Sequence, residues 1–174
     1  MENVNNFIIS EEKTLTKYTG KDSKIIIPDG VKKIDRNVFY NQEFIEEIYI
    51  PESIEIIEEN NFIECKNLKF NVVDKIKYLG NEKSPYLVLI SSDRDIKDAP
   101  IQEGCKLIMS NAFNECYNLS KINLPSSVRY IGYMAFYNCN SLSELSFSEN
   151  IKTIESNAFY DCNIKKLILP KKLE

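Results

Sequence analysis

Cysteine is the residue type with which this chain could do the most chemistry. The chain has five cysteines, Cys65, Cys105, Cys116, Cys139 and Cys162, and no histidine. A thiolate can ligate a metal, attack a carbonyl or pair in a disulfide, but there is no C-x-x-C motif and no imidazole to act as base or co-ligand. The absence of histidine excludes Ser/His/Asp and Cys/His catalysis. We expect buried free thiols that pack as small apolar side chains, with disulfides or a thiolate metal site as the alternatives.

Glutamate is concentrated in one segment of the chain. Residues 43–64 contain eight Glu and no Lys or Arg, whereas the preceding segment carries Lys24, Lys32, Lys33 and Arg36. This segregation indicates either a solvated acidic face or a docking site for a basic partner. Adjacent carboxylates such as Glu58 and Glu59 perform acid/base catalysis only in a water-poor cleft, and the sequence indicates none. We therefore expect no enzymatic activity, no cofactor and no metal.

The composition fits one ordered domain. The chain has 174 residues, of which 43% are hydrophobic and 28% charged, with a net charge of −4. Mild acidity excludes the basic field that favours nucleic acid, and no apolar run is long enough for membrane insertion. The first residues, Met1 to Asn3, lack the features of a signal peptide. The sequence as it stands indicates a cytoplasmic location, and a secreted or cell-surface location follows if a signal or larger context was removed.

An internal repeat dominates the chain. Phenylalanine recurs at spacings of 23, 51, 23 and 23, in the column Phe39, Phe62, Phe113, Phe136 and Phe159. An isoleucine stands five residues before each Phe, and a cysteine stands three residues after it in every copy except the first, which has Gln42. The longer interval fits two repeats with a short insertion. One degenerate, enlarged repeat is therefore expected at about residues 71–105, with a hairpin or bulge in residues 76–90.

A repeat of this length predicts an α/β solenoid in which each coil contributes one strand and one return segment. We expect about six coils over residues 24–170, mostly parallel β-structure, with a β-hairpin cap at residues 1–23 and a tail at 171–174. The cap is expected from two apolar segments, 7–9 and 14–18, around a polar turn. Short helical or 3₁₀ turns are expected around Asn111–Phe113 and Asn157–Phe159.

These columns resemble the BspA-like class of leucine-rich repeats. Its pattern is an apolar-Pro strand end, an apolar-x-x-Ile step, and then Ala-Phe-x-x-Cys, and the clearest copy here is Leu124–Cys139. The chain departs from the pattern at Val38 and Asn61, which replace Ala, and in a last turn shortened by one residue. The resemblance implies a right-handed solenoid that binds proteins, often in bacterial surface adhesion, and it brings no catalytic motif.

Strand residues that alternate with the inward apolar positions must face the open side of the sheet. We expect this sheet face to bind a protein partner of unknown identity. The candidate binding residues are Tyr49, Lys121, Asn123, Glu144, Ser146 and Lys166. Tyrosines that follow the repeat Phe, such as Tyr137 and Tyr160, are expected mainly to cover neighbouring coils. The alternative function is a structural fragment of a larger adhesin-like surface protein that self-associates through an open C-terminal strand at residues 165–170.

Overall fold

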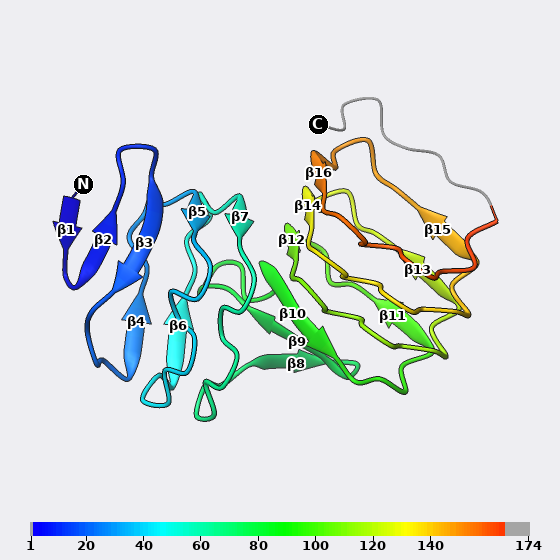
Figure 1. Ribbon diagram of the computed structural model, residues 1–174, viewed down its shortest axis with the longest axis horizontal. Coiled ribbons are helices and arrows are strands. Elements are labelled where there is room, and N and C mark those ends of the chain that lie inside the picture. Colours follow the sequence, from blue (N-terminus) through cyan, green and yellow to red (C-terminus); the bar gives the residue numbers. More distant parts are fainter. Residues whose placement is uncertain (1, 166–174) are drawn as a thin grey trace.

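The computed structural model describes residues 2–165, which form short strands stacked into an elongated solenoid (Figure 1). The predicted C-terminal strand at residues 165–170, which includes Lys166, lies outside the described residues except for residue 165, and so does the predicted tail at 171–174.

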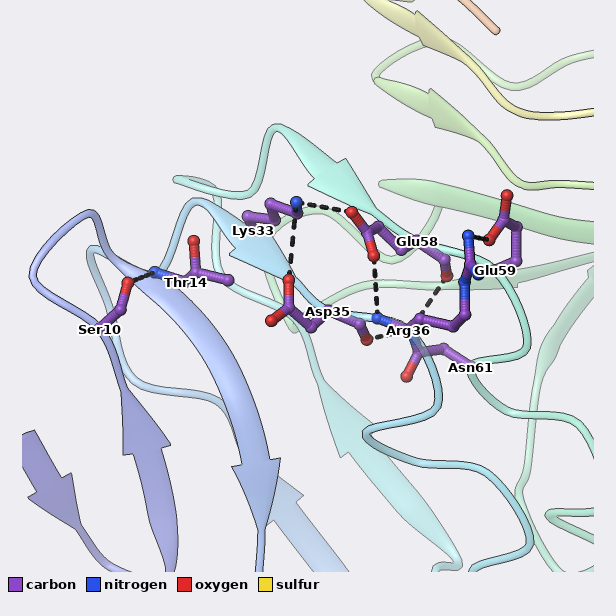
Figure 2. Close-up of polar contacts among 8 residues, drawn as sticks. All are labelled: Ser10, Thr14, Lys33, Asp35, Arg36, Glu58, Glu59 and Asn61. Carbon is purple, nitrogen blue, oxygen red and sulfur yellow. Dashed lines mark hydrogen bonds and ion pairs between the residues drawn. The ribbon is translucent and has the colours of Figure 1, made fainter. Parts of the chain in front are cut away.

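The N-terminal cap is an antiparallel meander. Strands β1 (Glu2–Val4), β2 (Phe7–Ile9) and β3 (Thr14–Tyr18) pair in that order, and β3 then pairs in parallel with β5 (Lys33–Ile34). The backbone N–H of Thr14 donates to Ser10 Oγ at 3.3 Å across the tight β2–β3 turn (Figure 2). The predicted hairpin is present, and it covers the first coil with paired backbone groups instead of a bare strand edge.

Two rows of parallel strands run along the stack. One row holds the short strands β5, β7 (Ile56–Ile57), β12 (Leu107–Ile108), β14 (Tyr130–Ile131) and β16 (Thr153–Ile154). The other row holds β4 (Lys24–Ile26), β6 (Glu47–Tyr49), β11 (Asp98–Pro100), β13 (Lys121–Asn123) and β15 (Glu144–Ser146). Partners on adjacent coils are separated by one repeat length, as in Lys24↔Glu47 and Ile122↔Leu145. The repeat length therefore sets the register of the stack, as predicted.

The enlarged repeat interrupts both rows. Strands β8 (Asn71–Val73), β9 (Ile76–Leu79) and β10 (Val88–Ser92) form an antiparallel meander, and β10 pairs with β12 on the next coil. Strands β5 and β7 therefore belong to one sheet and β12, β14 and β16 to another. A single bridge, Tyr49↔Gly80, continues the β4–β6 row. Only glycine fits at Gly80, because a Cβ there would lie 2.0 Å from the carbonyl oxygen of Ser84.

The prediction of helical or 3₁₀ turns was wrong for the described residues, which contain no helix. Residues two before and two after each repeat Phe have positive φ, for example Asn111 at 61° and Glu115 at 60°. A left-handed residue ends a right-handed helix before one turn is complete. Six of these ten positions hold Asn, the residue that tolerates this conformation best after glycine, so the recurring Asn is the feature of the sequence that indicates these turns.

The interior consists of ladders of identical side chains. The rings of Phe113 and Phe136 stack with centroids 4.9 Å apart, and those of Phe136 and Phe159 stack at 5.0 Å. In the first half, Tyr18 extends the ladder from Phe39 toward the cap. Each offset aromatic pair adds about 0.5–1.5 kcal/mol beyond its burial.

Candidate interaction surfaces

The cysteine column is structural. All five thiols are free, and four of them are buried. Cys65, Cys139 and Cys162 each donate a hydrogen bond to the carbonyl oxygen of the Phe one coil earlier, at 3.0, 3.1 and 3.0 Å. Burial raises the pKa of Cys65 and raises that of Cys105 to about 12, so these thiols are protonated and weakly nucleophilic at neutral pH. The described residues contain no cluster of three or more Cys, Asp or Glu that could hold a metal.

The eight glutamates of residues 43–64 are all paired. Five of their ion pairs join residues separated by one repeat length, so the carboxylate on one coil meets a cation at the same position of an adjacent coil; these pairs are Lys24–Glu47, Lys32–Glu55, Arg36–Glu59, Glu43–Lys66 and Glu46–Lys69. Glu58 pairs with Lys33 at 2.6 Å and Glu52 with Lys106 at 2.6 Å (Figure 2 shows the pairs of Lys33 and Arg36). Glu64 lies 4.0 Å from Lys66. The acidic and basic segments are separate in the sequence, but stacking of the coils brings their side chains together in ion pairs.

These pairs change the interpretation of the acidic segment. The hydrogen bond from Lys33 lowers the pKa of the Glu58 carboxyl, and the same contact raises the pKa of Lys33. Most of the pairs are solvent-exposed, so each contributes roughly 0.2–1 kcal/mol. Because each carboxylate already has a cation, the hypothesis of a docking site for a basic partner loses its basis. The spacing of Lys and Glu by one repeat length could have revealed these pairs in the sequence.

Asn61 repairs a departure from the repeat pattern. In regular junctions the repeat Phe N–H donates to the backbone carbonyl of Ala on the next coil, as Phe113 does to Ala135 at 2.7 Å. At Asn61 the side chain replaces this backbone acceptor, because its Oδ1 accepts a hydrogen bond from Phe39 N–H at 3.1 Å. Its Nδ2 donates to the carbonyl oxygens of Asp35 and Glu58, each at 2.9 Å. Asn61 is therefore a structural residue and does not form part of a catalytic site.

The predicted binding residues fall on two separate sheet faces. Tyr49 lies on β6 beside Ile26 of β4, and we call these two strands the N-terminal face. Lys121 and Asn123 of β13 lie beside Glu144 and Ser146 of β15, and β11, β13 and β15 make up the C-terminal face. Lys166 lies outside the described residues. The enlarged repeat separates the two faces, so the structure does not join Tyr49 to the other candidates in one row.

The two faces differ in chemistry. The candidate residues of the C-terminal face are exposed and polar, and Lys121 pairs with Glu144 at 3.1 Å. The N-terminal face presents Ile26, which is 63% exposed, and the half-buried ring of Tyr49, with Lys24 Nζ 4.7 Å from the ring centroid. Aromatic and aliphatic side chains are the usual anchors of protein interfaces, whereas rim charges contribute less. The N-terminal face is therefore the more apolar of the two.

Two hollows flank Tyr49. One, of about 340 Å³, lies between β6 and the enlarged repeat and includes Phe70 and Pro85. The other, of about 290 Å³, includes Ile26, Pro51 and Lys83. Asn81 and Glu82 line both hollows. Sequence reasoning missed these loop residues, because only the fold of the enlarged repeat brings residues 80–85 over the end of β6.

Some of the tyrosines near the repeat Phe pack against neighbouring coils, and others are half exposed. Tyr137 and Tyr160 stack with centroids 5.2 Å apart, and Tyr130 is buried with its hydroxyl 3.5 Å from Glu155. Burial and the neighbouring carboxylates raise the pKa of Tyr130. Tyr40, Tyr117 and Tyr160 remain about half exposed.

Comparison with known protein families agrees with this architecture. The profile of the BspA type leucine rich repeat region matches residues 4–83 and 93–174 in six copies. The chain belongs to this family. The unmatched residues 84–92 include all of β10, where the enlarged repeat departs from the pattern. The repeat fold of this family is a non-enzymatic scaffold.

Solved bacterial proteins share this fold. A leucine rich cell surface protein from Faecalibacterium prausnitzii aligns with a TM-score of 0.57 and 24% identity, over 87% of this chain and 48% of that one. The pneumococcal vaccine antigen PcpA aligns with a TM-score of 0.55 and 23% identity, over 92% of this chain and 35% of that one. The chain therefore spans less than half the length of either protein. A search of curated proteins gave no significant match. Among the described residues no helix is long and apolar enough to cross a membrane.

Proposed function

We propose that this repeat domain is a non-enzymatic module that binds a protein partner, with the N-terminal face as its principal contact. The observation that supports this most is the pair of exposed Ile26 and half-buried Tyr49 beside two hollows. An apolar anchor beside preformed hollows is the arrangement in which a partner side chain can be desolvated.

The rigidity of the stack favours this role. Adjacent coils are joined by backbone hydrogen bonds, stacked rings and ion pairs, so the face is ordered before a partner arrives. A preformed surface avoids the entropic cost of ordering side chains and loops on binding. In this proposal the C-terminal face, with Lys121, Asn123, Glu144 and Ser146, forms a polar extension that adjusts specificity and association rate.

The test is a quantitative affinity capture from extracts of the source organism and its surroundings, followed by binding assays with each purified candidate partner. Wild type is compared with an N-terminal face variant, Ile26→Ser with Tyr49→Ala, and a C-terminal face variant, Lys121→Glu with Ser146→Arg. Tyr160→Ala on an exposed turn is the matched control, because it removes a similar ring elsewhere. The proposal predicts loss of one partner with the N-terminal face variant and little change with the control.

Two outcomes contradict the proposal. If all variants bind the same partner with equal affinity, the sheet faces are not the site. If only copies of the chain itself are recovered and light scattering shows a mass that rises with concentration, self-association replaces partner binding as the function.

A further inference from the structure

A third groove lies where the two sheets meet without pairing. It has a volume of about 510 Å³. Residues 52–56, which include part of β7, line one side, and the opposite side is lined by three successive coils through Lys106–Leu107, Arg129–Tyr130 and Lys152–Thr153. The groove belongs to the strand row that contains β7 and β12 and is distinct from the two sheet faces described above.

The opposite wall of the groove breaks the charge pattern of the molecule. One position in the repeat is held by Lys32, Glu55, Lys106, Arg129 and Lys152. In the first half its charges alternate, and Lys32 pairs with Glu55 at 3.4 Å. In the second half three cations follow one another on adjacent coils, at a strand spacing of about 4.8 Å. Like charges in register destabilise a sheet, so this row is unfavourable without an anion beside it.

Two of the three cations have no carboxylate partner among the described residues. Lys106 pairs with Glu52 at 2.6 Å. The Arg129 guanidinium donates only to the carbonyl oxygens of its own turn, Ser126 at 2.5 Å and Val128 at 3.1 Å, and Lys152 forms no ion pair within residues 2–165. Glu52 and Glu55 on the facing wall are already neutralised by Lys106 and Lys32. Arg129 and Lys152 therefore give the groove a net positive charge.

The facing wall has an open strand edge. In the regular coils the backbone carbonyl oxygen at this repeat position accepts a hydrogen bond from the N–H at the same position of the next coil. Arg129 N–H donates to the Lys106 carbonyl oxygen at 2.8 Å, and Lys152 N–H donates to the Arg129 carbonyl oxygen at 2.8 Å. The next residue at this repeat position after Glu55 is Lys106, beyond the enlarged repeat, and its N–H donates instead to the carbonyl oxygen of Leu87 at 2.8 Å. Within the described chain the carbonyl oxygen of Glu55 receives no hydrogen bond, and β7 is the last strand of its sheet.

We propose that this groove binds an extended acidic segment of a partner protein. The segment adds to the edge of β7, its backbone N–H donates to the Glu55 carbonyl oxygen, and its carboxylates bind Arg129 and Lys152 across the groove. A peptide fits better than an anionic glycan because it supplies an amide donor and regularly spaced carboxylates together. This site is separate from the N-terminal face, so either proposal can fail without the other.

The probe is a fluorescein-labelled octapeptide of alternating Glu and Thr, titrated by fluorescence anisotropy at low salt. Alternate residues of an extended strand face the same side, so its carboxylates point together toward the cations. We expect at least tenfold weaker binding to Arg129→Gln with Lys152→Gln, and weaker binding by wild type as salt is raised. Lys17→Gln with Lys97→Gln is the matched control, because it removes the same charge from exposed positions outside the groove, and its affinity should stay within twofold of wild type.

Further arms separate the parts of the proposal. Lys152→Gln alone changes an exposed side chain, so it should not disturb the fold, and it should still weaken binding of the peptide. This result would show that binding is lost with the contact and not because the Arg129 variant is misfolded. Peptides N-methylated at alternate residues should bind at least threefold more weakly in one of the two registers; equal affinity in both would overturn strand addition. A Gln-for-Glu peptide that binds as well as the acidic one, or a heparin-derived octasaccharide that binds when the acidic peptide does not, would overturn the proposal.

Discussion

Replacing Asn61 by alanine restores the family's residue at this position but is expected to destabilise this chain. The side chain satisfies Phe39 N–H and the carbonyl oxygens of Asp35 and Glu58, and Asn61 is only 5% exposed. A buried polar group left without a partner costs about 1–3 kcal/mol. Alanine is harmless at 135 and 158 because the Phe N–H of the preceding coil donates to its backbone carbonyl. At Asn61 the backbone differs, since Phe62 has φ of 67°.

We expect Asn61→Ala to lower the free energy of unfolding by about 2 kcal/mol. The buried Phe39 N–H loses its acceptor, and the carbonyl oxygens of Asp35 and Glu58 lose their donor. For a chain of this size the melting temperature should fall by roughly 4–8 °C. The assay is thermal and urea unfolding followed by circular dichroism, with Asn67→Ala as control, because Asn67 makes an exposed side-chain hydrogen bond of 2.6 Å to Glu43. Unchanged stability of Asn61→Ala would refute the reasoning, because the peptide between residues 61 and 62 would then rotate to the regular geometry at no cost.

Three further predictions concern the core, the thiols and the ion pairs. Phe136→Ala removes the middle ring of a three-ring stack and should lower the free energy of unfolding in urea by about 3–5 kcal/mol. Tyr160→Ala removes a ring that is 57% exposed and should lower it far less, so similar decreases for both variants would contradict the role of the Phe stack. In native protein at pH 8, mass-resolved alkylation should modify the half-buried Cys162 first and Cys105 last, because burial raises the pKa of Cys105 to about 12; early labelling of Cys105 would show that the coil opens locally. The hydrogen bonds from Lys33 and Lys106 lower the pKa of Glu58 and Glu52, so these two ion pairs stabilise the fold above the unfolded pKa of about 4.5, and this stabilisation is lost as pH falls through the lower native pKa values. Glu58→Gln should therefore flatten the decrease in melting temperature at acid pH. An unchanged decrease would exclude the Lys33–Glu58 pair as a contributor.

The regular part of the fold could be predicted because each repeat position has one physical task. A buried Phe, an inward Ile and a Cys at fixed offsets can all be buried only if successive coils stack in register. The same arithmetic, applied to Lys and Glu, would have predicted the ion pairs of Lys24, Lys32 and Arg36. The segregation of charge along the chain hides this pairing, because the paired residues stand one repeat length apart.

The irregular part could not be predicted from the sequence pattern. The pattern indicated that residues 76–90 contain a hairpin but not that β10 would pair with β12 and leave β7 without a neighbour. That choice depends on tertiary packing: Leu87, Val88 and Leu107 join the N-terminal core cluster together with Phe62 and Leu68. Burial of these side chains across the break, rather than any local propensity, fixes how the second half sits on the first.

The irregular repeat is also what gives the surface its distinct hollows. In a uniform stack each outward position recurs once in every coil, so one coil offers the same contacts as the next, and a partner has no fixed register. Here the meander brings Asn81 and Glu82 beside Tyr49, and it leaves a groove that is lined by Glu55, Arg129 and Lys152. Neither arrangement occurs elsewhere among the described coils. The regular coils make the stack rigid by repeating one simple pattern. The single interruption makes the surface chemically asymmetric, which specific recognition requires.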